Sequence, residues 1–270
     1  MTWSETLGEL ATFASTFDAL LLAGLLLAAH RLRDARALRA LPWVAVAWFG
    51  FVRGGCPCPI GGVGEAAMGS GMAAGAAAMF LMPLAFAQLH GRTFCNGACP
   101  LGAFQDVFGF RARNRKSKIP APLERRLALL RWVALAGVVS AAAFAGRNLL
   151  CEFDPLPNLY SLRFETGAFA VAAGLALASF VASRPFCRWL CPYAPLLESC
   201  ARLAPVRLIA GKPACVRCGK CDKVCPMNAI HKGEIEAGAC IRCGRCAAIC
   251  PRDAVHRQKE ADAEGAPAPR

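Results

Sequence analysis

Apolar stretches alternate with polar segments over the first two thirds of the chain, at residues 11–29, 38–52, 66–89, 127–146 and 168–183. A helix that crosses a bilayer needs about 20 apolar residues, so the pattern predicts about five membrane spans. The second stretch is short and carries Pro42, and the fifth is also short; either could be tilted, kinked or partly re-entrant. Glu5 and Glu9 precede the first stretch without any Lys or Arg, which favours a retained anchor over a signal peptide.

A short motif occurs twice within this apolar part. Phe94–Pro100 reads FCNGACP and Phe186–Pro192 reads FCRWLCP, and each copy follows a predicted span. Two copies in the same orientation imply a pseudo-twofold axis along the membrane normal. The sequence therefore predicts a mostly α fold: a polytopic helical membrane bundle built from two pseudo-symmetric helix hairpins, followed by a small C-terminal α+β domain.

Composition and charge support a membrane class. Hydrophobic residues make up 56% of the chain and the mean hydropathy is +0.40. The net charge of +13 comes from basic residues beside apolar stretches, without a recognition-helix pattern, so we expect no nucleic acid partner. The basic loops after the first and third stretches predict a multi-pass protein of the bacterial inner membrane, with the N-terminus outside and the C-terminal domain cytoplasmic. The loop after the first stretch contains Arg31, Arg33, Arg36 and Arg39, and the loop after the third contains Arg92, Arg111, Arg113, Arg115, Lys116, Lys118, Arg125 and Arg126.

Sixteen cysteines fall mainly in short clusters that end in proline, which is typical of metal ligation rather than disulfides. Two C-terminal runs share the spacing Cys-x2-Cys-x2-Cys-x3-Cys-Pro, the bacterial ferredoxin pattern for two [4Fe–4S] clusters. In this pattern the fourth cysteine of each run ligates the other cluster. The predicted ligands are Cys215, Cys218, Cys221 and Cys250 for the first cluster, and Cys240, Cys243, Cys246 and Cys225 for the second. A pair of zinc sites is the alternative.

The two motifs in the apolar part have the spacing Cys-x3-Cys-Pro. Residues i and i+4 share a helix face, so each motif could present two thiolates on one surface. Together, Cys95, Cys99, Cys187 and Cys191 could make one four-thiolate site and hold a third iron–sulfur centre. The alternative is a set of buried thiols that pack the turns or act during assembly.

Four further cysteines stand apart from these motifs. Cys56, Cys58 and Cys151 fall on the predicted outer side, where a disulfide among three thiols leaves one over and keeps a metal or thiol-exchange role open. Cys200 is interpreted as a small buried apolar residue. Ionisable residues in or beside the apolar stretches are candidates for proton-coupled chemistry, or alternatively snorkel or lie in water at a span's end. They are Asp18, His30, His90 and Arg131.

The order of motifs resembles the NapH/NosR-type membrane polyferredoxins, in their short, NapH-like form without a periplasmic flavin-bearing domain before the first span. The resemblance rests on Phe94–Pro100, Phe186–Pro192 and the two ferredoxin runs, and covers most of the chain. It implies three segments: a transmembrane domain at 1–210, a 2[4Fe–4S] ferredoxin domain at 211–257 and a disordered tail at 258–270. It also implies electron exchange with the quinol pool and a redox protein partner, as in a quinol dehydrogenase subunit.

Two other functions remain open at this stage. The chain could be a maturation factor that carries electrons to a metal or thiol on the outer face, for which Cys56, Cys58 and Cys151 are the candidate residues. It could also be a membrane-anchored ferredoxin without a substrate of its own. Of the three, the sequence favours the relay between the quinol pool and a redox partner.

Overall fold

The computed structural model describes residues 3–32, 35–53, 59–69, 74–109, 121–146, 148, 166–205, 208–210 and 214–257. The predicted outer-face thiols, Cys56, Cys58 and Cys151, lie outside these residues, as does the predicted tail at 258–270.

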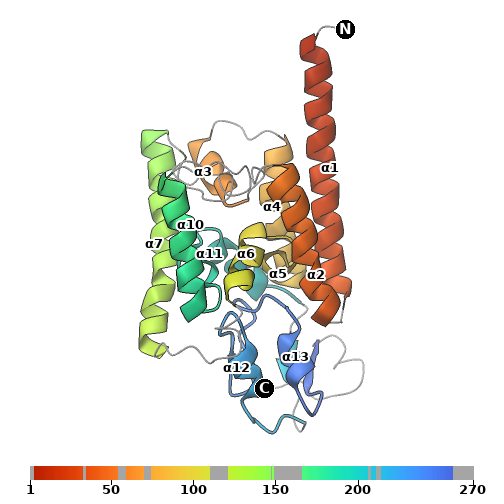
Figure 1. Cartoon of the computed structure of the whole chain (residues 1–270), viewed down its shortest axis with the longest axis vertical. Coiled ribbons are helices and arrows are strands. Elements are labelled where there is room, and N and C mark those ends of the chain that lie inside the picture. Colours follow the sequence, from red (N-terminus) through yellow and green to blue (C-terminus); the bar gives the residue numbers. More distant parts are fainter. Residues whose placement is uncertain are drawn as a thin grey trace.

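Most of the chain is helical, and the helices stand side by side above a small domain of short strands and helices (Figure 1). The helical part consists of α1 (Trp3–Arg31), α2 (Ala35–Ala45), π-helical η1 (Val46–Val52), α3 (Gly61–Met68), α4 (Ala74–His90), α5 (Phe94–Gly97), α6 (Pro100–Phe108), α7 (Ala121–Ala145), α10 (Thr166–Val181), π-helical η3 (Phe186–Leu190) and α11 (Ala194–Arg202).

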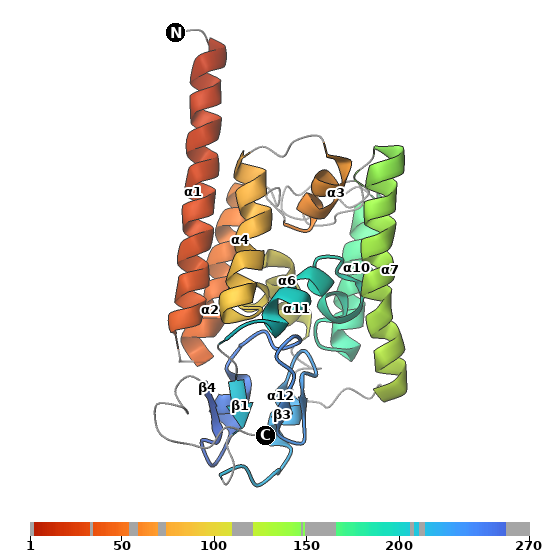
Figure 2. The same ribbon diagram turned by 180° about the vertical axis from the view of Figure 1, so that it is seen from behind.

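The repeated motif is visible in how these helices pack. In the first copy α4 leads through α5 to α6, and in the second α10 leads through η3 to α11. Helix α6 packs against α10, and α11 packs against α4, so the short helix of each copy rests on the long helix of the other. The turns that carry the cysteines are therefore brought together in the centre of the molecule (Figure 2).

The prediction of about five membrane spans in a polytopic bundle is wrong. Among the described residues one helix, Arg126–Ala145 within α7, is long and apolar enough to cross a membrane. The apolar stretches at 38–52, 66–89 and 168–183 correspond to the shorter apolar helices Ala40–Val52, Gly75–His90 and Phe169–Val181, each of 10–17 residues. The stretch at 66–89 is divided between α3, which ends at Met68, and α4, which begins at Ala74. Helices of this length fall short of the roughly 20 residues needed to span a bilayer.

The C-terminal part has the fold of a small ferredoxin-like domain. Strand β1 (Leu208–Ala210) pairs antiparallel with β4 (Val255–Arg257), and β2 (Ile230–His231) pairs antiparallel with β3 (Glu234–Ile235). Helices α12 (Lys220–Val224) and α13 (Arg245–Ile249) pack against each other, and α12 contacts β2 while α13 contacts β4. One short helix and one cysteine run occur in each half of the domain.

Candidate metal centres

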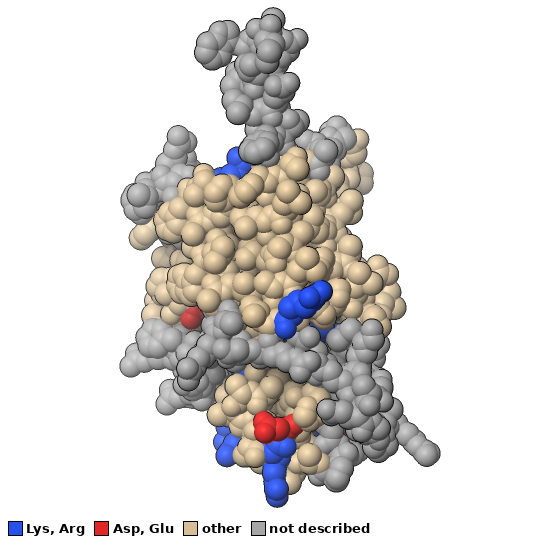
Figure 3. All heavy atoms as spheres, turned by 90° about the vertical axis from the view of Figure 1, so that its right-hand side faces the viewer, with Lys and Arg blue, Asp and Glu red and all other residues tan. Residues whose placement is uncertain are grey.

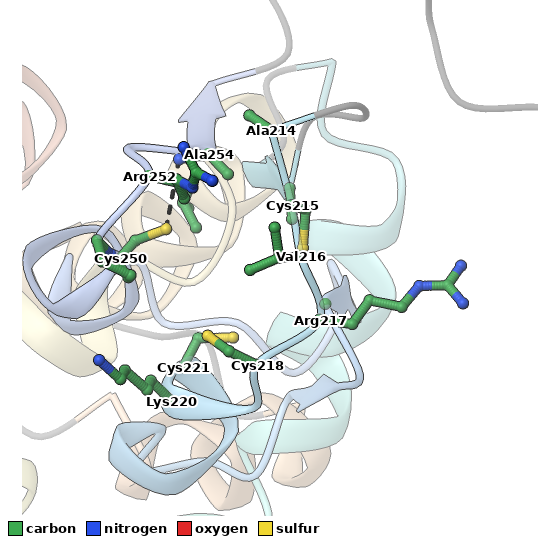
Figure 4. Close-up of a pocket in the computed structure, with 14 residues that line it drawn as sticks. Ala214, Cys215, Val216, Arg217, Cys218, Lys220, Cys221, Cys250, Arg252 and Ala254 are labelled. Atoms are coloured by element: carbon green, nitrogen blue, oxygen red, sulfur yellow. Dashed lines mark hydrogen bonds between the residues drawn. The ribbon is translucent and has the colours of Figure 1, made fainter.

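The structure gathers the first predicted set of ferredoxin cysteines around one pocket. Cys215, Cys218, Cys221 and Cys250 all line it, and three of them come from the first run while Cys250 comes from the second (Figure 4). Cys218 is exposed, so this pocket opens to solvent. Burial, followed by the neighbouring Asp222 carboxylate, raises the pKa of the Cys221 thiol to about 11.

The second predicted set is also assembled, and it is more deeply buried. Burial, together with the neighbouring thiolates of Cys243 and Cys240, raises the pKa of Cys225 to about 12. Burial and the thiolates of Cys240, Cys243 and Cys225 likewise raise the pKa of Cys246. Such thiols must lose their protons to bind iron, so loading of this set releases protons.

The arrangement of the thiols fits a cluster better than a single ion. Zinc draws four ligands to a point, at about 2.3 Å from each sulfur. Among the residues that the structure describes, no three His, Cys, Asp or Glu side chains converge closely enough to hold one metal ion. The thiols of the first set instead surround a pocket, as they must to hold the four irons and four sulfides of a cubane.

Backbone geometry in the two runs is equivalent and is adapted to enclose a cluster. Gly219 and Gly244 have φ of 71° and 70° and precede α12 and α13, a left-handed conformation that glycine adopts without strain. The backbone N–H of Ala229 donates to the sulfur of Cys225 at 3.2 Å, and the N–H of Ala254 donates to Cys250 at 3.4 Å. Hydrogen bonds of this kind to ligand sulfur tune a cluster's potential.

The predicted third set lies where the two copies of the repeat meet. Burial raises the pKa of Cys191, and the thiolates of Cys187 and Cys95 raise it further. Burial also raises the pKa of Cys187, a shift that nearby Arg184 opposes and Cys95 reinforces. Cys95, Cys187 and Cys191 therefore lie close together, while Cys99 is half-buried at the start of α6.

Four cysteines that precede proline share one backbone conformation. Their ψ angles lie between 112° and 115°, because the proline ring excludes the helical region for the residue before it. The four are Cys99, Cys191, Cys225 and Cys250. The spacing Cys-x3-Cys-Pro occurs in the ferredoxin runs as well as in the repeated motif. This shared spacing, visible in the sequence, relates the two kinds of motif.

A charged network joins the third set to the ferredoxin domain. Arg184 is 1% exposed and binds the Asp106 carboxylate through two hydrogen bonds, from Nε to Oδ1 at 3.1 Å and from Nη2 to Oδ2 at 2.9 Å. Its Nη1 donates to the carbonyl oxygen of Cys95 at 2.6 Å. Asp106 also accepts from Nη2 of Arg245, the first residue of α13, at 3.0 Å. Burial lowers the pKa of Arg184, but Asp106 more than offsets this, so Arg184 stays charged beside the thiols.

Two further buried side chains contact the third set directly. Arg92 lies 3.8 Å from the sulfur of Cys95 through Nη2, and Gln105 lies 3.3 Å from the sulfur of Cys187 through Nε2. Gln105 Oε1 also accepts from the backbone N–H of Phe186 at 3.0 Å, which links α6 to η3. Sequence reasoning missed Arg92, Arg184, Asp106 and Gln105, because isolated polar residues near a motif carry no spacing signal.

The remaining sequence candidates lie apart from the three sets. Cys200 is half-buried in α11, and burial alone raises its pKa. Asp18 is buried in α1 and pairs with Nε of Arg53 at 2.9 Å and with Nε1 of Trp48 at 2.8 Å. The rings of His30 on α1 and His90 on α4 contact each other, with centroids 3.9 Å apart and planes tilted by 54°.

Two family models match the chain at the regions that hold these cysteines. The model described as a 4Fe-4S binding domain matches twice, at residues 72–120 and 165–211, and the LdpA Fe-S cluster-binding domain matches residues 212–261. The first model thus covers both copies of Cys-x3-Cys-Pro, and the second covers the ferredoxin runs. No solved structure matches the chain.

Several curated proteins are similar to part of the chain. Protein NirI of Paracoccus denitrificans is 29% identical over 51% of this chain and 21% of its own length. The putative electron transport protein YccM of Escherichia coli is 26% identical over 56% of this chain and 46% of its own length. The regulatory protein NosR of Pseudomonas aeruginosa is 29% identical over 55% of this chain and 22% of its own length. The chain therefore spans less than half the length of each of these relatives.

The cysteine sets, the matched models and these relatives together define an iron–sulfur protein of the electron transport class. Within that class the resemblance drawn from the order of motifs is confirmed. The chain is a NapH/NosR-like iron–sulfur protein.

Proposed function

We propose that the chain is a membrane-associated relay that passes electrons singly between the quinol pool and a redox protein partner. The observation that carries this proposal is the succession of three cysteine sets. The first opens to solvent through Cys218, the second is buried, and the third lies between the two copies of the repeat. We propose that each holds a [4Fe–4S] cluster, with the ligands named from the sequence and the ferredoxin domain at 211–257.

The buried arginines support a third centre at the repeated motif. A [4Fe–4S] cluster with four thiolates is an anion, and burying an anion without counter-charge is costly. Arg92 and Arg184 are each 1% exposed and both interact with Cys95 or Cys187. Cys187 of the third set and Cys243 of the second set both raise the pKa of Arg184. The second and third sets are therefore neighbours. A third cluster would extend the relay from the ferredoxin domain into the helical part.

The surface of α7 supports membrane association. Only 11% of the Arg126–Ala145 window is buried, whereas the core helix of a soluble protein is mostly buried, and this exposure supports contact of α7 with lipid. Phe144 is 92% exposed and Val133 64% exposed. Over the helical part, the face in Figure 3 is mostly uncharged, while Lys, Arg, Asp and Glu gather on the small domain below.

The orientation follows from the charges at one end of α7. Glu124, near the start of the helix, accepts from Nδ2 of Asn228 in the ferredoxin domain at 3.0 Å, so both lie at the same end. The basic stretch from Arg111 to Lys118 comes directly before this end of the helix. Because positive charge favours the cytoplasmic side, we propose a cytoplasmic ferredoxin domain at the inner membrane.

Reduction by a quinol is the direct test of this function. We expect a short-chain quinol added anaerobically to the purified oxidised protein to produce the EPR signal of reduced [4Fe–4S] clusters. The control is sodium dithionite, which shows how much of the signal the sample can give. A full signal with dithionite and none with either ubiquinol or menaquinol analogues contradicts the proposal.

A further inference from the structure

A cavity of about 570 Å³ lies between α7, α11 and the ferredoxin domain, and nothing in the cysteine motifs accounts for it. Its volume is in the range typical of small-molecule sites. Glu124, Ala128 and Arg131 follow one another at helical spacing on one face of α7 and all line the cavity. Arg92, Arg188 and Glu198 line it from the side of the repeated motif.

Arginines in the cavity wall carry buried N–H donors that have no acceptor among the described residues. Arg92 is 1% exposed and Arg188 is 5% exposed, and each has a buried Nε–H without an acceptor in the part of the chain that the structure describes. Buried donors are costly to leave unpaired, so they indicate an oxygen-bearing ligand or ordered water. Both side chains line the same cavity.

A buried carboxylate lies in the same wall. Glu198 is 3% exposed and pairs with Nη2 of Arg131 at 2.6 Å and with Nη2 of Arg202 at 2.7 Å. Glu124 forms a second ion pair, with Arg188. A wall that carries carboxylates beside guanidinium groups suits a neutral ligand with both O–H donors and oxygen acceptors better than an inorganic anion.

The cavity touches the predicted redox centres on one side and an apolar surface on the other. Arg92 lies 3.8 Å from the sulfur of Cys95, and Ala239 in the cavity wall directly precedes Cys240. On the opposite side, Leu129 and Trp132 of α7 line the cavity and are 61% and 48% exposed. A ligand that arrives along the apolar face of α7 would therefore stop beside the thiols.

We propose that this cavity binds the headgroup of a quinol and that Glu198 accepts a proton from its hydroxyl group. The inference rests on the proposed function and adds the site and the proton acceptor. Oxidation of the quinol to the quinone breaks two O–H bonds and releases two electrons and two protons. The electrons reduce two oxidised [4Fe–4S] clusters by one each, and the protons pass in turn to Glu198 and then to water.

Binding tests the site independently of turnover. We expect Ala128→Phe, which fills the cavity, to weaken binding of a short-chain quinone by about tenfold or more in isothermal titration calorimetry with the full chain in detergent. Ala136→Phe is the matched control, because Ala136 is exposed two turns further along α7 and does not line the cavity. Both variants must keep the iron content and circular dichroism of the unaltered protein.

The proton acceptor is tested by Glu198→Gln, which keeps the shape of the side chain. We expect quinone binding within about twofold of the unaltered protein, reduction by quinol slower by about a hundredfold, and unchanged reduction by dithionite. Glu65→Gln on α3, at the far end of α7 (Figure 2), should change none of these.

The outcomes separate the two proposals. Suppose that quinol reduces the unaltered protein but Ala128→Phe binds quinone as tightly as the unaltered protein does. The cavity is then not the quinol site, and the proposed relay function is unaffected. If Glu198→Gln is reduced at the normal rate, Glu198 is not the acceptor. If the unaltered protein neither binds quinone nor is reduced by quinol, both proposals fail.

Discussion

Replacing Cys225 with serine is expected to remove about four iron atoms from the chain, one whole cluster, and the lost cluster should be the one held by the second run. Cys225 belongs to the first run in the sequence, but its sulfur lies among those of Cys240, Cys243 and Cys246. The EPR spectrum of the reduced Cys225→Ser protein should therefore match that of Cys243→Ser.

Matched variants make this prediction sharp. Cys250→Ser should resemble Cys218→Ser, because Cys250 and Cys218 line the same pocket. Cys200→Ser is the control, because burial alone raises the pKa of Cys200 and no other thiol contributes. The interleaved assignment is wrong if Cys225→Ser instead matches Cys218→Ser.

Replacing Cys187 with serine is expected to uncouple the ferredoxin domain from the quinol. Cys187 interacts with Arg92, which lines the cavity, and with Arg184, which also interacts with Cys243 of the second set. Serine retains an acceptor for the amide of Gln105, so the contact between α6 and η3 is kept. We expect dithionite to reduce the two remaining clusters normally, while reduction by quinol falls to background in stopped-flow absorbance measurements.

The same Cys200→Ser variant controls for the loss of a thiol in the helical part. A Cys187→Ser protein that is reduced by quinol at the normal rate would show that electrons do not need a centre at the repeated motif. In that case the thiols at the repeat serve packing or assembly, the alternative that the sequence left open.

The ligand sets could be read from the sequence because their chemistry imposes a spacing. The loops around Gly219 and Gly244 and the cysteines before Pro226 and Pro251 follow local rules of backbone conformation, and these rules act over a few residues. In the structure Cys215, Cys218, Cys221 and Cys250 line one pocket, and Cys225 lies near Cys240, Cys243 and Cys246, while their role as cluster ligands stays a prediction.

The helical part could not be predicted in the same way. Mean apolarity does not reveal where a helix ends, and the stretch at 66–89 contains Gly69, which ends α3 with φ of 64°. Residues Arg92 and Arg184 in turns, and Asp106 on α6, acquire their roles only when α6 packs on α10 and α13 docks below. Contacts between residues so distant in sequence leave no periodic signal.

The number of clusters is the most direct measure of the proposed relay. The measurement is iron and acid-labile sulfide per chain in protein purified and reconstituted without oxygen. Three centres in succession predict about twelve iron and twelve sulfide atoms per chain. A stable value of about eight, with Cys187→Ser unchanged from the unaltered protein, would contradict a third centre and end the relay at the ferredoxin domain.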